Sequence, residues 1–327
     1  MREIVSFLLI IITKVWSLSW QARHRGGVQI GFGWNITVLK KLIKSGVPLF
    51  LINLSNVLKI SGTVFLISHY FDAKIVGYYS LALSVQNFIY WTPNAFSVVM
   101  FPRFQARYAD SNDQAAALHT YLVKPTIGLA FFLLPVLLSA TYFIVPSLIE
   151  QILPAFRPTI EIMFVMLLGT FFLSLEHMPA QFLTTINKLW ERVIISLLSL
   201  FLMAACVTPA VMLGGDIKYF VAGLSLANLL GLVIILAYAT YHTNNPRSKH
   251  WLVPSLLAAF FYLVVVVLAV DHYFPSSHST WLLALQFAFV KWLLALILLL
   301  PLFVVAERNL DLLSTTSALL RQFRARI

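Results

Sequence analysis

The sequence has few charged residues for its length. Charged side chains make up 11% of its 327 residues, whereas 60% of the residues are apolar. Soluble domains average about 25% charged residues, and a soluble core of this size has no room for so many Leu, Ile, Val and Phe side chains. The shortage of charge therefore excludes an ordinary soluble domain and indicates that a lipid bilayer surrounds most of the chain.

Cysteine and recognisable catalytic motifs are also scarce. The one cysteine, Cys206, lies in the middle of an apolar run. It has no partner for an internal disulfide, and its setting is typical of a small buried apolar side chain. The H-E-x-x-H metal motif and the G-x-S-x-G nucleophile motif are both missing from the sequence. We therefore expect no metal site, no cofactor and no enzymatic activity.

Acidic residues are few, and the chain is basic. Twelve Asp and Glu stand against 23 Lys and Arg, which gives a formal net charge of +11. Fifteen of the basic residues lie in alternate connections between apolar segments, which cover residues 21–44, 101–121, 181–192, 242–250 and 307–327. The positive-inside rule explains this distribution better than nucleic-acid binding does. We expect these connections and the carboxyl terminus in the cytoplasm, and no nucleic-acid partner.

Nine apolar segments of about 17–26 residues are long enough to cross a bilayer as helices. They cover residues 4–20, 46–70, 77–100, 122–145, 159–180, 190–213, 217–240, 251–271 and 281–306. The sequence therefore predicts an all-α polytopic membrane protein with about nine transmembrane helices. The amino terminus then lies outside without a cleavable signal. Because this is unusual for an intact multispan protein, we expect further helices upstream.

The second and third segments each carry a polar face. On a helical wheel, Asn53, Asn56, Lys59 and Thr63 fall within an arc of about 160° that also contains Ser55. The next segment has a narrower polar stripe, beside Pro93, that spans about 100°. It consists of Gln86, Asn87, Tyr90, Asn94 and Ser97. Two neighbouring membrane helices with polar faces, one of them bearing a lysine, predict the wall of a water-filled cavity.

Three short motifs resemble landmarks of one known family. A basic stretch runs into G-x-P in KSGVPL at residues 44–49, VGYYSLA follows at residues 76–82, and FPRF closes the helix at residues 101–104. Their order resembles that of Wzx-type polysaccharide flippases of the MOP superfamily, which also contains MATE drug exporters. Each motif is degenerate, so the resemblance rests on their succession. Family members often carry an acidic residue where this chain has Lys59.

The resemblance implies three parts of the chain. Residues 1–44 correspond to the last helix of a missing first lobe followed by a basic cytoplasmic linker. Residues 45–241 correspond to the second six-helix transport lobe, and residues 242–327 to two terminal helices and a cytoplasmic basic tail. A separate polypeptide that supplies the first lobe is therefore an expected partner.

The function implied is translocation of a polyprenyl-diphosphate-linked oligosaccharide across the bacterial inner membrane by alternating access, for surface polysaccharide synthesis. This chain alone is expected to be incomplete for transport. Three alternatives stay open. They are a membrane enzyme of envelope glycan synthesis, such as a glycosyltransferase or polymerase, a MATE-like drug exporter, and a scaffold that transports nothing.

The expected substrate-binding residues follow from the two polar faces. A charge at the bilayer centre is costly, so we expect Lys59 to face the cavity and meet the diphosphate. The side chains expected to bind sugar are Asn53, Asn56, Gln86, Asn87, Tyr90 and Asn94. Helix-to-helix hydrogen bonding is the competing role for these residues. Lys14 and Lys124 are further candidates for the cavity, with snorkelling to the interface as the alternative.

Three other charged residues within or near the apolar segments are assigned to the membrane interface. Lys291 is expected to snorkel, as lysines in membrane helices commonly do. Glu161 and Glu176 lie close to predicted helix ends, where carboxylates reach water.

Overall fold

The computed structural model describes residues 36–110, 122–212, 215–242, 246–274 and 281–310. All regular elements within these ranges are helices, and seven of them are long and apolar enough to cross a membrane. The seven are Ile36–Tyr70, Leu122–Ile152, Thr159–Thr185, Leu189–Met212, Ile217–Tyr241, Trp251–Tyr273 and Trp281–Leu298. The prediction of an all-α polytopic membrane protein is confirmed. The predicted segment at residues 4–20 lies outside the described ranges.

The chain divides into two compact units, Met1–Val47 and Pro48–Ile327. Helix α2 (Ile36–Tyr70) begins in the first unit and continues into the second. The remaining described helices and the cavity belong to the second unit. The division into a lobe at residues 45–241 and two terminal helices stays a prediction.

From Pro48 onward, α2 turns its polar side toward the protein. The buried positions Ile52, Ser55, Thr63 and Ile67 recur every three or four residues, and Lys59 between them is partly buried. Exposed apolar side chains, among them Val57, occupy the opposite side. A polar face turned inward and an apolar face turned outward is the arrangement that a lipid solvent favours.

Helix α3 (Ala73–Asp110) contains the predicted segment 77–100 but is not among the seven apolar helices. It is 38 residues long, so length is not what separates it from the others. Its polar stripe lowers the mean hydropathy, and Pro93 and Pro102 lie inside the helix. Membrane helices tolerate such prolines where neighbouring protein groups satisfy the freed carbonyls.

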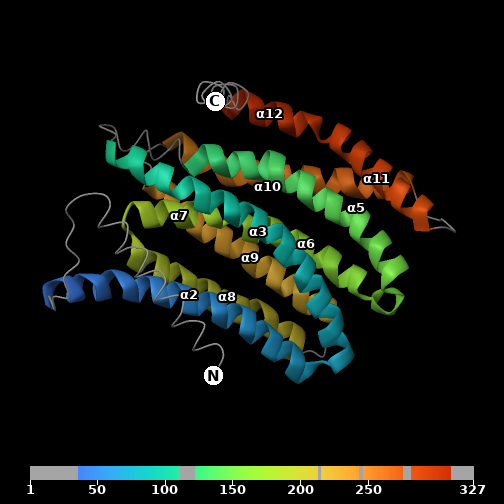
Figure 1. Cartoon of the computed structure of the whole chain (residues 1–327), viewed down its shortest axis with the longest axis horizontal. Coiled ribbons are helices and arrows are strands. Elements are labelled where there is room, and N and C mark those ends of the chain that lie inside the picture. The colour runs from blue at the N-terminus through green and yellow to red at the C-terminus, as the bar shows by residue number, and fades with distance from the viewer. Residues whose placement is uncertain (1–35, 111–121, 213–214, 243–245, 275–280, 311–327) are drawn as a thin grey trace, which may run out of the picture. The chain divides into compact units, whose positions relative to one another are not determined.

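Close packing of small residues holds the centre of the second unit together. Helix α9 (Ile217–Tyr241) packs between α6 (Thr159–Leu175) and α8 (Leu189–Met212), and α3 packs on α6 (Figure 1). The Ser225 hydroxyl on α9 donates to the Val165 carbonyl on α6 at 3.0 Å. Small residues let membrane helices approach until their backbones are in contact.

Helices near the carboxyl terminus pack against a different part of this unit. The segment Leu122–Ile152 includes a π turn, η1 (Leu129–Leu133), followed by α5 (Leu134–Ile152). Pro135 has no N–H to continue the regular ladder, which accounts for the wider turn. Helix α11 (Trp281–Leu298) runs along α5 and also contacts α10 (Pro246–Tyr273).

The last predicted segment, residues 281–306, is not one continuous helix. The structure interrupts it at Leu299, after which α12 (Leu300–Leu310) contacts η1. Pro301 lacks the N–H that would bond the Ile297 carbonyl, which explains why the helix breaks at this point.

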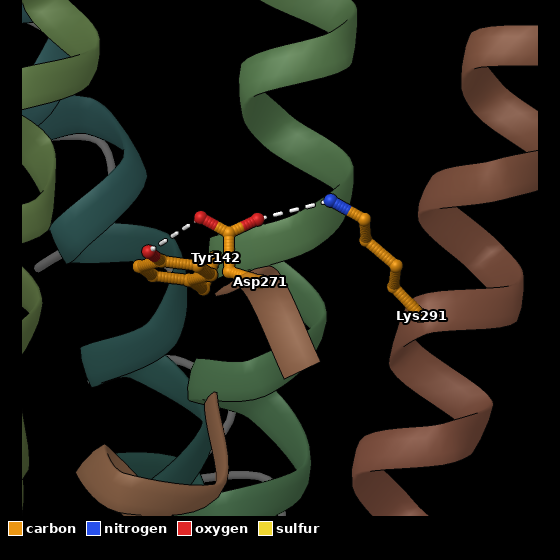
Figure 2. Close-up of polar contacts among 3 residues, drawn as sticks. All are labelled: Tyr142, Asp271 and Lys291. Atoms are coloured by element: carbon orange, nitrogen blue, oxygen red, sulfur yellow. Dashed lines mark hydrogen bonds and ion pairs between the residues drawn. The ribbon is translucent and has the colours of Figure 1, made fainter. Parts of the chain in front are cut away.

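An ion pair between α10 and α11, extended by a tyrosine of α5, joins these three helices (Figure 2). The Lys291 ammonium of α11 donates to Asp271 Oδ1 of α10 at 2.9 Å, and the Tyr142 hydroxyl of α5 donates to Asp271 Oδ2 at 3.4 Å. Tyr142 also stacks on Phe164 of α6, with ring centroids 4.3 Å apart. The Lys291 side chain is buried, so its ammonium meets a carboxylate of the neighbouring helix that lies two residues before the end of α10. That Lys291 snorkels to the membrane interface stays a prediction.

The small residues between α9 and its neighbours generate the first prediction. A Cβ on Gly169 would lie 2.8 Å from Ser225 Cα, and one on Gly223 would lie 2.6 Å from the Cys206 carbonyl oxygen. Because both obstacles are backbone atoms, we expect Gly169→Ala and Gly223→Ala to destabilise the protein by about 1–3 kcal/mol. Thermal unfolding of purified protein in detergent measures this.

The matched control is Gly62→Ala, since a Cβ on Gly62 meets nothing within 4 Å. It should unfold at the wild-type temperature or above it, because alanine favours helix. Equal melting of all three variants would contradict the packing described.

The ion pair generates a second prediction. The Lys291 side chain is 4% exposed and that of Asp271 is 47% exposed. Asp271→Asn deprives a buried cation of its carboxylate, and we expect it to cost about 3 kcal/mol. Lys291→Met leaves a carboxylate that can turn to solvent, so it should cost less. The double variant should be more stable than Asp271→Asn alone, as SDS-induced unfolding would measure, and purely additive effects would argue against the pair.

Candidate functional site

A cavity of about 400 Å³ lies among the helices of the second unit. It receives side chains from α2, α3, α6, α8 and α9 and from the short helix α7 (His177–Thr185). Seven of the predicted substrate-binding residues line it, namely Asn53, Asn56, Lys59, Gln86, Asn87, Tyr90 and Asn94. The structure thus brings the two polar faces together around one space. That these residues bind substrate stays a prediction.

Helix α2 supplies the cationic side of this cavity. Lys59 lies between Asn56 and Thr63 on the face turned toward the protein. The Thr63 hydroxyl donates to the Lys59 carbonyl at 2.7 Å and also lies 3.5 Å from Met203 Sδ on α8. The Thr63 hydroxyl thus bonds the backbone of its own helix, whereas the Lys59 side chain lines the cavity.

Helix α3 supplies amides and an aromatic ring. Gln86, Asn87, Tyr90 and Asn94 recur at helical spacing and form a continuous stripe along the wall. The Tyr90 ring packs on the His177 imidazole of α7, with centroids 4.6 Å apart. This contact fixes the tyrosine beside the amides.

A break between α6 and α7 brings two further polar residues into the wall. Pro179 lacks the N–H that would bond the Leu175 carbonyl, so the helix is interrupted at Glu176, whose own carbonyl accepts the Ala180 N–H at 3.1 Å. Glu176 and His177 line the cavity. The placement of Glu176 at the interface is therefore wrong. The signal in the sequence for a kinked helix with a polar bend was Pro179, which follows the pair Glu176-His177 after one intervening residue.

The Glu176 carboxylate lies in a notch formed by α8 and α9. A Cβ on Gly231 would lie 2.7 Å from Glu176 Oε1 and 3.3 Å from Ser199 Oγ. Glycine at position 231 therefore leaves the space that the carboxylate occupies. Glu176 and Lys59 line the same cavity.

Arg192, in the first turn of α8, is the second cation of the wall. Its Nη1 donates to the Thr184 hydroxyl of α7, and its charge interacts with Tyr90 and His177. Sequence reasoning counted Arg192 with the cytoplasmic basic connections and missed it. The residue lies at a helix start next to a connection, so the sequence alone does not show that its side chain turns toward the cavity.

The charges of the lining leave the cavity positive. Two cations, Lys59 and Arg192, face one carboxylate, Glu176, so the formal sum is +1. Among the residues that the structure describes, no group of three or more His, Cys, Asp or Glu is arranged to hold a metal ion. The cations of the wall can bind an anion, and its amide side chains can bind hydroxyl groups.

The remaining predicted cavity residues do not join this site. Lys124 is exposed and is not part of the cavity lining. Lys14 lies outside the described residues. Glu161, near the start of α6, forms an ion pair with Lys218 of α9, with side chains 63% and 46% exposed, which fits its expected place at an interface.

Comparison with known families bears on the first half of the chain. Residues 2–155 match the family model of polysaccharide biosynthesis proteins, and this stretch contains α2 and α3 with their polar faces. Comparisons with curated proteins and with solved structures gave no significant match. The family match confirms the resemblance seen in the sequence and supports a polysaccharide flippase-type protein.

Proposed function

We propose that this protein translocates a polyprenyl-diphosphate-linked oligosaccharide across the inner membrane of a bacterium for surface polysaccharide synthesis. The observation that carries the proposal is the composition of one membrane cavity. It combines two cations with amide side chains from α2 and α3. The family match to polysaccharide biosynthesis proteins supports the same class of substrate.

The cations suit a diphosphate. At about 4 Å and an effective dielectric constant of about 20, one lysine–phosphate pair contributes roughly 4 kcal/mol before the cost of desolvation. Arg192 adds a planar guanidinium, which can hold two phosphate oxygens at once. Lys59 and Arg192 therefore offer an anionic head group two charged contacts within the cavity.

The amides suit sugars. Asn and Gln each present two N–H donors and a carbonyl acceptor, which match hydroxyl groups in either sense. Asn53, Asn56, Gln86, Asn87 and Asn94 all line the same space. These amides can bind glycans of different composition, because they do not select one particular sugar. Tyr90 adds an aromatic ring on which a pyranose can pack.

In the proposed mechanism the polar head group crosses through the cavity while the polyprenyl tail remains in lipid. Two lobes rock about the site so that it opens to one side of the membrane and then to the other. Residues 45–241 supply one lobe, and a second lobe, from the same protein or a partner polypeptide, completes the cavity. The carboxyl terminus is cytoplasmic in this proposal, as the distribution of Lys and Arg indicates.

Two alternatives have less support. A drug exporter that takes cations needs a carboxylate in its cavity, and Glu176 is one, but the two cations Lys59 and Arg192 outnumber it. An envelope enzyme would be expected to use outer-loop residues such as Asp271. That residue belongs to helix α10 and is occupied by Lys291 and Tyr142.

The test of the proposal is Lys59→Gln in cells that depend on this protein. We expect surface polysaccharide to fall by at least about tenfold, because losing one side of a buried charge pair costs about 2–5 kcal/mol. Immunoblotting of the membrane fraction checks that the variant accumulates. Lys124→Gln is the matched control, since Lys124 is an exposed lysine outside the cavity, and it should behave as wild type. Normal polysaccharide in the Lys59→Gln strain would rule the proposal out.

A further inference from the structure

The first residues of α2 carry an apolar face that is exposed. At 100° per residue, five apolar positions of residues 36–44 fall within an arc of about 160°. Their side chains are 44–67% exposed, and they are Ile36, Val38, Leu39, Leu42 and Ile43. Leaving such a face in water is unfavourable, so this part of the helix needs an apolar phase to lie against.

The other side of the same segment is polar and cationic. Thr37, Lys40 and Lys44 fall within an arc of about 60°, and all three are exposed. The two lysines are four residues apart, which places them side by side on one face of the helix. A helix with apolar residues on one side and lysines on the other is typical of a segment that lies in the membrane–water interface.

The length of α2 leaves these residues outside the hydrocarbon. A helix of 35 residues is roughly 50 Å long, whereas the hydrocarbon core is about 30 Å thick and needs about 20 residues. Residues 48–70 already supply a span of that length. Pro48 lies inside the helix and has no N–H to donate to the Lys44 carbonyl, so the helix can change direction at this point.

We propose that residues 36–44 lie in the interface of the bilayer and bind the head groups of anionic phospholipids through Lys40 and Lys44. The apolar face lies against the acyl chains near the head groups, and the lysines pair with phosphate oxygens. The rest of α2 crosses the same bilayer, so lipid is the apolar phase within reach of this face. Neither lysine lines the cavity, so the inference does not rest on the proposed function.

The experiment measures which lipids contact this face. The full chain carries Cys206→Ser, so that a bimane label on Leu42→Cys is unique, and it is reconstituted in nanodiscs. Phosphatidylglycerol or phosphatidylcholine that bears a nitroxide quenches the label by contact. We expect both lipids to quench it, with phosphatidylglycerol associating at least about fivefold more strongly, since one lysine near an anionic surface contributes about that factor. In the variant Lys40→Gln/Lys44→Gln the preference should fall below about twofold, while quenching by phosphatidylcholine persists.

The matched control is Lys74→Gln, because Lys74 is an exposed lysine in the first turn of α3, and it should keep the wild-type preference. Equal association of the two lipids in wild type would overturn the proposal, and so would a preference that survives the loss of both lysines. A label that neither lipid quenches would overturn it as well, since protein, such as a second lobe or a second copy of the chain, would then cover the face. Thermal melting establishes that every variant is folded.

Discussion

The arrangement of this protein depends on the cost of an unpaired charge in a lipid solvent. Lys291, which lies within a membrane helix, has an oppositely charged neighbour, Asp271, on another helix, and this pair joins α10 and α11 to α5. Lys59, also within a membrane helix, instead faces a cavity lined by polar side chains. The same constraint thus produces a structural contact in one place and a candidate binding site in another.

The regular spacing of polar residues along two helices made much of this site predictable. The faces of α2 and α3 follow from spacings of three and four residues, and all seven polar residues predicted from those two segments to bind substrate line the cavity. The seven apolar helices correspond to seven of the nine segments expected from length and composition. Local pattern suffices here because each helix must turn its polar side away from lipid whatever its neighbours are.

The rest depends on contacts between residues far apart in the chain. Glu176 reaches the cavity because Pro179 interrupts its helix and because Gly231, on another helix, leaves room for its carboxylate. Lys291 is buried because Asp271, twenty residues earlier, lies opposite it in the folded protein. A search for periodicity treats each helix alone. It therefore assigned Glu176 to a membrane interface and Arg192 to a connection.

The polar stripe of α3 has a consequence for how the protein enters the membrane. Insertion of a helix from the translocon follows its own hydrophobicity, and α3 falls below the apolarity of the seven other long helices. Its neighbour in the chain, α2, is separated from it by only two residues. The two helices then partition into lipid most readily together, because each would expose its polar face to lipid if it entered alone. The feature that makes the cavity polar thereby makes the biogenesis of α3 dependent on that of α2.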